Sequence, residues 1–351
     1  MPAQPPTSIG SCSGATGTLC LTTTMSNNTA LDLIILIPVY NDWESAAQIL
    51  PRLDAQLAGL PVRTRILVLD DASRRPAPAD LVPGGLRHVT TVESVRLRRN
   101  LGHQRAIAVG LSFIHVERLC DAVLVMDADG EDKPEDVPRL IRRLLEDGRR
   151  KVIFAQRVRR SEGFVFRLCY HLYRLGHRLL TGVPVRIGNF SILPAHHVAT
   201  LAVVSDTWNH YAASVVKSRI EHGFVPTERG TRLAGHSHMD FPALVLHGLS
   251  AISVFAETVT VRLILAIFSL IVVLAALLAV VLAARWGNQL AIPGWAIIGA
   301  GLLLVAVMQM LTVAVGLSLL ILFNRSNLSF LPLRDYRFFV GQPQTIYARP
   351  G

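Results

Sequence analysis

Cysteine is scarce in this sequence: its 351 residues contain only 4, and no two of them form a Cys-x-x-Cys pair. Without that spacing, the sequence does not predict a zinc site. So few cysteines also argue against a disulfide framework of the kind that stabilises small secreted proteins. We expect ordinary reduced thiols at all four positions, which are Cys12, Cys20, Cys120 and Cys169.

Signatures of nucleic-acid binding are also missing, although the formal net charge is +10. No helix-turn-helix, zinc-finger or RNA-binding motif accompanies the positive charge. Arginines that cluster beside apolar spans more often meet anionic lipid headgroups. The sequence therefore predicts no nucleic-acid partner.

The first 29 residues lack the basic start and the apolar core of a secretory signal. They are rich in Ser, Thr, Gly and Pro, and their glycines follow no strand that would make them a phosphate loop. We expect residues 1–29 to form a disordered tail.

Charged residues are absent from two long stretches near the end of the chain. Only 17% of all residues are charged and 51% are hydrophobic, and the mean hydropathy of +0.40 is high for a soluble protein. Each uncharged stretch is long enough to cross a bilayer core of about 30 Å. We predict transmembrane helices at 263–284 and 295–323; two buried core helices are the alternative, which their length disfavours.

The distribution of arginine predicts the orientation of these spans. The connector 285–294 carries one cation, whereas the tail 324–351 holds four and the region before the first span is also rich in arginine. Cytoplasmic segments carry the excess of positive charge. We therefore expect both termini and the domain before the spans in the cytoplasm, with the protein integral to the membrane.

Residues 30–238 alternate β-rich runs with helical patterns, which is typical of an α/β domain with a mostly parallel sheet. The strand candidates are 31–37, 65–69, 88–92, 122–126 and 151–155, and the helix candidates are 44–57, 102–113 and 134–146. In such sheets, ligands bind at the carboxyl ends of the strands. Polar residues follow four of the runs, at 38–42, 70–73, 127–129 and 156–157.

The most informative of these ends is the one after the run 122–126, where Asp127, Asp129, Glu131 and Asp132 follow within six residues. Closely spaced carboxylates at one sheet edge can hold Mg²⁺ or Mn²⁺ against a diphosphate. The alternative is an acidic helix N-terminus, because Pro134 suits a first turn and acids suit the helix dipole. From this motif alone both interpretations stay open.

Five motifs appear in the order seen in family 2 glycosyltransferases of GT-A fold, which this sequence resembles. They are Ile-Pro-Val-Tyr-Asn-Asp (37–42), Leu-Asp-Asp-Ala-Ser (69–73), Asn-Leu-Gly-His-Gln-Arg-Ala-Ile-Ala-Val-Gly (100–110), Asp-Ala-Asp (127–129) and Arg-Leu-Ala-Gly-His-Ser (232–237). The sequence looks most like the membrane branch of dolichol-phosphate mannose synthases and bactoprenol glucosyltransferases. The resemblance spans roughly residues 31–323.

The resemblance implies a nucleotide-sugar donor whose base, ribose and sugar lie against the first three motifs. An aromatic face, carboxylate acceptors and a glycine that permits close backbone approach suit that task. The residues implied in donor binding are Pro38, Tyr40, Asp42, Asp70, Asp71, Asn100, Gly102 and Gln104. Two alternatives remain: Tyr40 as core filling, and Asn100 as a helix cap next to a loop glycine.

The same resemblance implies a metal site and an acceptor site. Asp129 would bind Mg²⁺ or Mn²⁺ directly, Asp127 would hold the donor or the metal, and Glu131 stands where relatives often carry a further ligand. The acceptor would be a polyprenyl phosphate held by forked guanidinium groups. The residues implied are Arg157, also counted with Asp127 and Asp129 as catalytic, and Arg229, Arg232 and His238.

Two positions depart from the family pattern. His238 replaces the usual lysine, so a permanent cation becomes a titratable imidazole. Asn189 stands where many relatives have aspartate, and an amide cannot serve as a base. A phosphate monoester, with a second pKa of about 6, arrives mostly ionised and needs no general base, so the second departure favours a phosphate acceptor.

Residues 239–262 link the two halves. His247, Ser250 and Glu257 recur at helical spacing and leave a broad apolar face. We expect a juxtamembrane amphipathic helix in the membrane interface; a helix packed against the catalytic domain is the alternative.

Together these features predict an inverting, metal-dependent enzyme of the bacterial cytoplasmic membrane that moves one sugar from a nucleotide sugar, preferably a UDP-sugar, to a polyprenyl phosphate. Two other functions stay open. One is a processive polysaccharide synthase, whose usual Gln-x-x-Arg-Trp motif is absent from the sequence, and the other is a non-catalytic membrane scaffold. The sequence leaves assembly into a homo-oligomer undecided.

Overall fold

The computed structural model describes residues 30–157, 174–183, 187–234, 241–286, 295–326 and 330–350. The strands are β1 (Leu31–Val39), β2 (Val62–Asp70), β3 (Val89–Leu97), β4 (Ala122–Val125), β5 (Val152–Arg157), β6 (Ser191–Pro194), β7 (His222–Thr227) and β8 (Val340–Ala348). The helices of the catalytic domain are α1 (Trp43–Gln56), α2 (His103–Glu117), α3 (Val137–Glu146), α5 (Ala195–Ala202), α6 (Tyr211–Lys217) and α10 (Pro332–Asp335), with short 3₁₀ turns η1 (Pro134–Asp136), η2 (Ser205–Trp208) and η3 (Tyr336–Phe338). Three further helices are α7 (Phe241–Ser253), α8 (Ala256–Trp286) and α9 (Trp295–Ser326).

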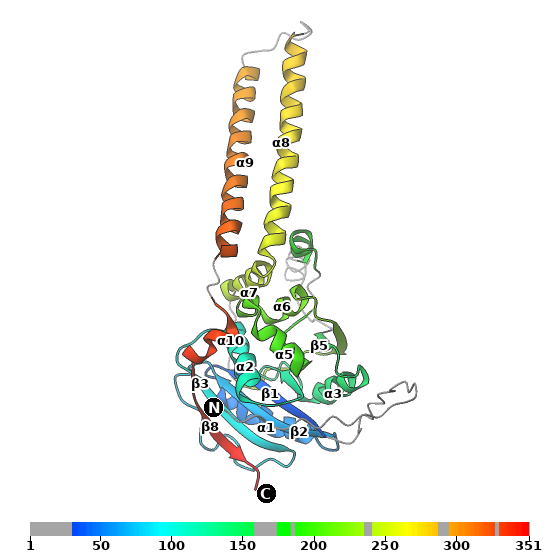
Figure 1. The fold of residues 1–351 in the computed structure, drawn as a ribbon, viewed down its shortest axis with the longest axis vertical. Coiled ribbons are helices and arrows are strands. Elements are labelled where there is room, and N and C mark those ends of the chain that lie inside the picture. The colour runs from blue at the N-terminus through cyan, green and yellow to red at the C-terminus, as the bar shows by residue number, and fades with distance from the viewer. Residues whose placement is uncertain are drawn as a thin grey trace, which may run out of the picture.

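The strands form one mixed sheet in the order β7-β5-β6-β4-β1-β2-β3-β8 (Figure 1). Strands β4, β1, β2 and β3 run parallel, and β5 is parallel to β7. Strand β6 is antiparallel to both β4 and β5, and β8 is antiparallel to β3. The predicted α/β class with a mostly parallel sheet is confirmed.

Strand β1 reads Leu-Asp-Leu-Ile-Ile-Leu-Ile-Pro-Val and is buried on both faces, because helices cover the sheet from two sides. One core cluster joins the sheet to α1 and α3, and the other joins it to α2, α5, α6 and the end of the chain. Helix α2 lies close to the sheet because Gly110 has no side chain: a Cβ there would overlap the side chain of Leu36. Helices thus cover both faces of the sheet, and the carboxyl ends of the parallel strands β1, β2 and β4 lie at one edge of it.

The end of the chain returns to the catalytic domain. After α9, the ring of Phe330 lies 3.7 Å from that of Trp208, Tyr336 is buried, and β8 closes the sheet beside β3. The Tyr336 hydroxyl donates a hydrogen bond of 2.8 Å to Glu117. The segment expected as a free cytoplasmic tail (324–351) therefore contributes an edge strand.

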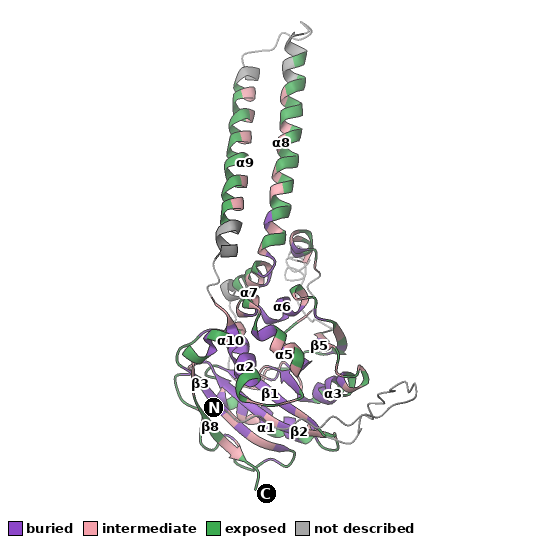
Figure 2. Cartoon of the chain, viewed as in Figure 1, coloured by how far each residue is buried: buried purple, intermediate pink, exposed green. Residues whose placement is uncertain are grey.

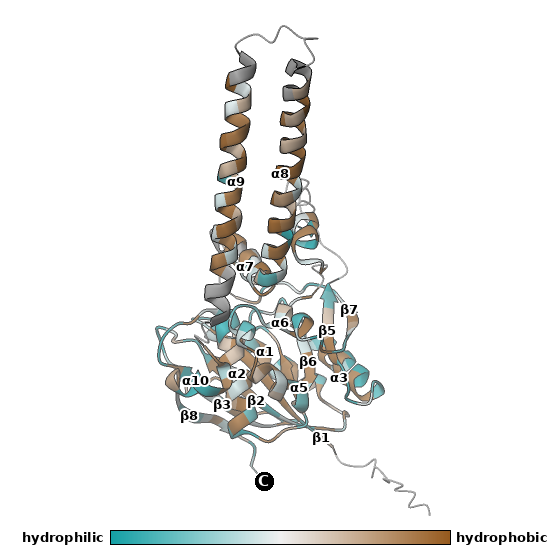
Figure 3. Cartoon of the chain, turned by 45° about the horizontal axis from the view of Figure 1, so that its top comes forward, coloured by the Kyte–Doolittle hydropathy of each residue, from teal (hydrophilic) through white to brown (hydrophobic). Residues whose placement is uncertain are grey.

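Helices α8 and α9 rise side by side from one end of the catalytic domain and are apolar along their length (Figures 1 and 3). Their stretches Ala256–Val280 and Ile298–Leu320 have mean hydropathies of 3.2 and 2.3 and are not buried by the rest of the protein. By length and composition both can cross a membrane, and Figure 2 shows their largely exposed surfaces. The two apolar helices expected after the catalytic domain are therefore present.

The predicted helix at 239–262 is broken in the structure. Helix α7 ends at Ser253, and Val254 and Phe255 turn inward against Ala213 of α6 before α8 begins. This small apolar cluster fixes the first long helix to the catalytic domain.

Candidate functional site

The acidic loop that follows β4 is shaped by its own carboxylates. The backbone NH of Asp127 donates to Asp132 Oδ2 at 3.0 Å, and that of Glu131 donates to Asp129 Oδ1 at 2.9 Å. Gly130 has a φ of +87°, a conformation that glycine adopts without strain. The turn therefore brings Asp127 and Asp129 together at the sheet edge, as the sequence predicts.

Burial and mutual repulsion perturb these acids. Loss of solvation, with a further contribution from Asp129, raises the pKa of Asp127 to about 7. Burial and the charge of Asp127 raise the pKa of Asp132 to about 7. Burial also raises the pKa of Asp129, although the hydrogen bond from the backbone NH of Glu131 acts to lower it. Such a cluster gains stability from a cation.

The donor set fits Mg²⁺ or Mn²⁺. Asp127 Oδ1 is buried and accepts no hydrogen bond in the described part of the chain, although His103 Nε2 lies 3.2 Å away. No three acidic, histidine or cysteine side chains among the described residues converge as a ready-made metal cage. Glu131 instead pairs with Arg229. Mg²⁺ is commonly held by one or two carboxylates and substrate phosphates, so Asp127 and Asp129 suffice on the protein side.

Three arginines predicted for the acceptor surround this loop. Arg157, at the end of β5, contacts Asp132 at 3.2 Å and Glu131 at 3.5 Å. Arg229 pairs with Glu131 at 2.6 Å. Arg232 lies 2.9 Å from Asp42 and 3.5 Å from Asp129, so it connects the ends of β1 and β4. The structure thus brings these arginines to the acidic loop.

The segment that carries Arg229 and Arg232 packs its backbone directly against the acidic loop. The NH of Gly230 donates to the carbonyl of Glu131 at 2.9 Å, and that of Leu233 donates to the carbonyl of Asp129 at 2.9 Å. A Cβ at position 230 would overlap the carbonyl oxygen of Gly130. Only glycine permits this approach.

The predicted donor residues after β1 lie at the same edge. Pro38 is buried in β1, whereas the Tyr40 ring is 41% exposed, which leaves a face for stacking. Asp42 accepts a hydrogen bond from Ser45 at 2.7 Å in addition to its pair with Arg232. Tyr40 is therefore not core filling.

The two aspartates after β2 hold the backbone of the rim. Asp70 Oδ1 accepts the NH of Ser73 at 2.7 Å. Asp71 is buried, and its two oxygens accept the NH groups of Leu101 at 2.7 Å and Gly102 at 2.8 Å. Burial raises the pKa of Asp71. In the structure this carboxylate supports the loop before α2, and its contact with a nucleoside stays a prediction.

The segment before α2 is held on both sides. Asn100 Nδ2 donates to the carbonyl of Asp71 at 3.2 Å, and Gly102 has a φ of +85°. Gln104 Nε2 donates to Asn189 Oδ1 at 3.2 Å, and Gln104 Oε1 accepts the NH of Tyr211 at 2.8 Å. Gln104 therefore joins α2 to the segments before β6 and α6.

His103 is a site residue that the sequence interpretation passed over. It lies in the third motif, but the motif does not show that its ring reaches Asp127. Asn189 Nδ2 lies 2.9 Å from His103 Nε2. Burial lowers the pKa of His103. His238, predicted for acceptor binding, lies outside the described residues.

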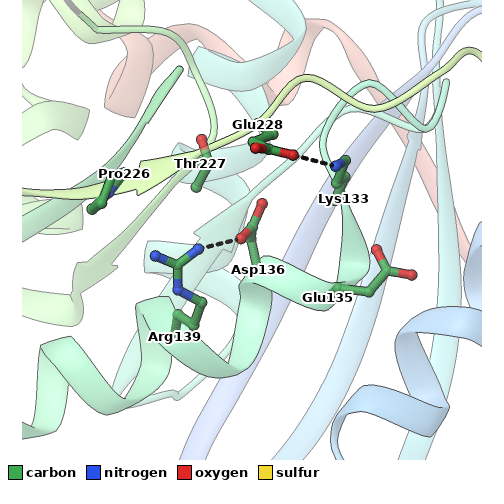
Figure 4. Close-up of a pocket in the computed structure, with 7 residues that line it drawn as sticks. All are labelled: Lys133, Glu135, Asp136, Arg139, Pro226, Thr227 and Glu228. Atoms are coloured by element: carbon green, nitrogen blue, oxygen red, sulfur yellow. Dashed lines mark hydrogen bonds and ion pairs between the residues drawn. The ribbon is translucent and has the colours of Figure 1, made fainter. Parts of the chain in front are cut away.

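An open cavity of about 430 Å³ lies beside the acidic loop. Neither Asp127 nor Asp129 lines it; its walls are Lys133, Glu135, Asp136, Arg139, Pro226, Thr227 and Glu228. Figure 4 shows two ion pairs in it, Lys133 with Glu228 at 3.6 Å and Arg139 with Asp136 at 2.8 Å. The cavity flanks the acidic loop.

Comparison with known proteins shows which family part of this sequence is similar to. Residues 34–198 match the model of glycosyl transferase family 2. An undecaprenyl-phosphate 4-deoxy-4-formamido-L-arabinose transferase of Erwinia tasmaniensis is 34% identical over 117 residues, which are 33% of this chain and 35% of that protein. The enzyme of that name from Klebsiella pneumoniae is 36% identical over 107 residues, 30% and 32% of the two chains. The chain thus spans about a third of the length of these curated relatives.

Similar solved structures include the mannosyl-3-phosphoglycerate synthase of Rubrobacter xylanophilus, with a TM-score of 0.45, 18% identity, and coverage of 65% of this chain and 73% of that one. A second is a glucosyl-3-phosphoglycerate synthase of Mycobacterium tuberculosis in complex with Mn²⁺, UDP-glucose and glycerol 3-phosphate. Its TM-score is 0.47 and its identity 16%, and the match covers 65% of this chain and 80% of that one. The matched residues 34–198 contain most of β1, all of β2 to β4, the acidic loop, Arg157 and Asn189. Residues 34–198 are thus similar to a glycosyltransferase domain of family 2, the family that the five motifs predict.

Proposed function

We propose that the protein transfers one sugar from a nucleotide sugar, preferably a UDP-sugar, to a polyprenyl phosphate at the cytoplasmic face of the membrane. One observation carries the proposal: Asp127 and Asp129 share a sheet edge with three arginines, in a domain joined directly to two helices that can span a membrane. The relatives named for undecaprenyl phosphate support the same acceptor class.

On the donor side, Asp127 and Asp129 would hold Mg²⁺ or Mn²⁺ against the diphosphate. When bound, the ion supplies Lewis-acid stabilisation of the leaving nucleoside diphosphate. Arg232, which pairs with Asp42 and Asp129, would turn toward the diphosphate oxygens when the donor binds. The raised pKa of Asp127 means that the site gains its full negative charge only above neutral pH or when a cation is present.

On the acceptor side, Asn189 stands beside His103 and cannot remove a proton. A lipid phosphate oxygen is already ionised and attacks the anomeric carbon in line, with inversion and without a covalent enzyme intermediate. The bond from that carbon to the diphosphate oxygen breaks, and both electrons leave with the nucleoside diphosphate. A product of retained configuration contradicts this step.

The test uses the purified full-length protein with polyprenyl phosphate, Mg²⁺ or Mn²⁺ and a panel of labelled nucleotide sugars. Label that enters the organic phase, with one sugar per lipid, is the expected result; a growing polymer indicates a processive synthase. Asp129→Ala should abolish transfer, whereas Asp80→Ala, at an exposed acid outside the site, should not. Unchanged transfer by Asp129→Ala refutes metal catalysis at this residue.

A further inference from the structure

A pair of histidines lies between the catalytic site and the helices that can span the membrane. The ring centroids of His210, directly before α6, and His247, in α7, are 4.8 Å apart. His210 is buried, and His247 is partly covered. Figure 1 shows α7 resting beside α6 at the end of the domain from which α8 rises. The pair thus occupies the junction of the two halves.

The outer side of α7 suits the membrane surface. Val245, Leu246 and Leu249 are 45%, 66% and 56% exposed, whereas Ala251 is buried and His247 faces His210. A helix with exposed apolar residues on one side and a contact with the rest of the protein on the other can lie in the membrane interface. One side of α7 is thus open to a membrane interface, while the other side packs against α6.

A chain of contacts leads inward from this pair. His210 precedes Tyr211, whose NH donates to Gln104, and Gln104 donates to Asn189. Asn189 contacts His103, whose Nε2 lies 3.2 Å from Asp127 Oδ1. Polar side chains therefore follow one another from α7 to the acidic loop.

Burial keeps both imidazoles neutral near pH 7, so the pair can offer an anion hydrogen-bond donors but no positive charge. Burial, with smaller contributions from His247, His103 and His177, lowers the pKa of His210 to about 3. Burial and His103 lower the pKa of His247 as well. No carboxylate contributes to either value within the described residues. The His210 Nδ1 accepts the NH of Ala213 at 3.3 Å, so in the neutral ring the proton resides on Nε2, where it can be donated.

A metal is a poorer guest, because no three histidine or acidic side chains converge as a ligand set in the described ranges. A phosphate monoester carries the acceptor oxygens and the negative charge that this imidazole pair lacks. Arg157 and Arg232 lie at the acidic loop, where they pair with Asp132 and Asp129.

We propose that His210 and His247 bind the phosphate of the lipid acceptor as it passes from the membrane surface toward Asp127. The inference rests on the proposed function, because it names where the acceptor of that reaction is held. His247, carried by the helix beside the lipid, is the specificity residue that admits a prenyl phosphate rather than a prenyl alcohol.

The experiment measures binding of farnesyl phosphate, farnesol and inorganic phosphate to the full-length protein in detergent by titration calorimetry. The wild type should bind farnesyl phosphate more tightly than either other probe, because both the chain and the charge are recognised. His247→Leu should weaken that binding about tenfold or more, the usual effect of losing a hydrogen bond to a charged group. His247→Gln should recover part of the affinity, and His115→Leu, at an exposed position on α2, should match the wild type.

Donor affinity, KM values and lipid affinity together distinguish failure of this inference from failure of the proposed function. Affinity for the nucleotide sugar should be the same in all variants, which shows that the domain is folded. In transfer assays, His247→Leu should raise the KM for the lipid and leave that for the donor unchanged. Wild-type protein that transfers sugar, together with a His247→Leu variant of equal affinity for farnesyl phosphate, overturns the inference alone. Wild-type protein that neither binds farnesyl phosphate nor transfers sugar overturns the proposed function as well.

Discussion

Gly230 provides the sharpest structural test of the site, because the segment that carries Arg229 and Arg232 can approach the acidic loop this closely only if residue 230 lacks a side chain. The substitution Gly230→Ala places a methyl group on the carbonyl oxygen of Gly130. Non-bonded carbon atoms are at their best separation near 3.5 Å, so the two backbones must move apart by about 1 Å. Both hydrogen bonds from this segment to the loop then lengthen.

The expected cost is about 1–3 kcal/mol of stability from overpacking. The larger effect is on activity, because a displacement of about 1 Å at a positioning group can lower the rate about a hundredfold. The assay compares initial rates of label transfer with the thermal midpoint. Gly84→Ala is the matched control, since a Cβ there meets nothing within 4 Å. If Gly230→Ala keeps the wild-type rate, the arginine segment does not need its contact with the loop.

Three further predictions concern the acids. Activity at limiting Mg²⁺ should rise with pH through about 7 as Asp127 ionises, and a rate profile that is flat between pH 5.5 and 8 contradicts this role. Folding raises the pKa of Asp132 from 3.8 to about 7, so its contribution to stability is fully present below pH 3.8 and is lost as pH rises through 7. Without divalent ions, the thermal midpoint should therefore be higher at pH 5.5 than at pH 8. Asp132→Asn should reduce this difference. Asp71→Asn leaves one of two backbone NH groups without its acceptor and should cost about 1–3 kcal/mol in denaturant unfolding, whereas Asp80→Asn should cost nothing measurable.

Local sequence patterns were enough to predict the first half of the sheet. Five expected strand runs overlap β1 to β5, and the helical patterns overlap α1, α2 and α3 with η1, because apolar runs and their polar ends are local signals. Strand β8 lay beyond this reasoning. Its sequence, Val-Gly-Gln-Pro-Gln-Thr-Ile-Tyr-Ala, has few apolar residues, and its place is set by pairing with β3, more than 240 residues earlier.

The candidate site was predicted as a set of residues but not as a set of contacts. The spacing of Asp127 and Asp129 indicates a shared edge, yet nothing in the sequence shows that Glu131 pairs with Arg229. Likewise, Asp71 looks like a ligand group until its oxygens are seen on the NH groups of Leu101 and Gly102. Such pairings depend on the tertiary positions of segments far apart in the chain.

The most direct test of the central claim follows sugar transfer to lipid phosphate while the divalent ion is removed and restored. Full-length protein in lipid nanodiscs receives polyprenyl phosphate and the reactive labelled nucleotide sugar, first with a chelator and then with excess Mn²⁺. The account predicts no label in the lipid fraction under chelation, full recovery with Mn²⁺ in the wild type, and no recovery in Asp129→Ala. Transfer that continues under chelation, or that Mn²⁺ restores equally in the variant, contradicts it.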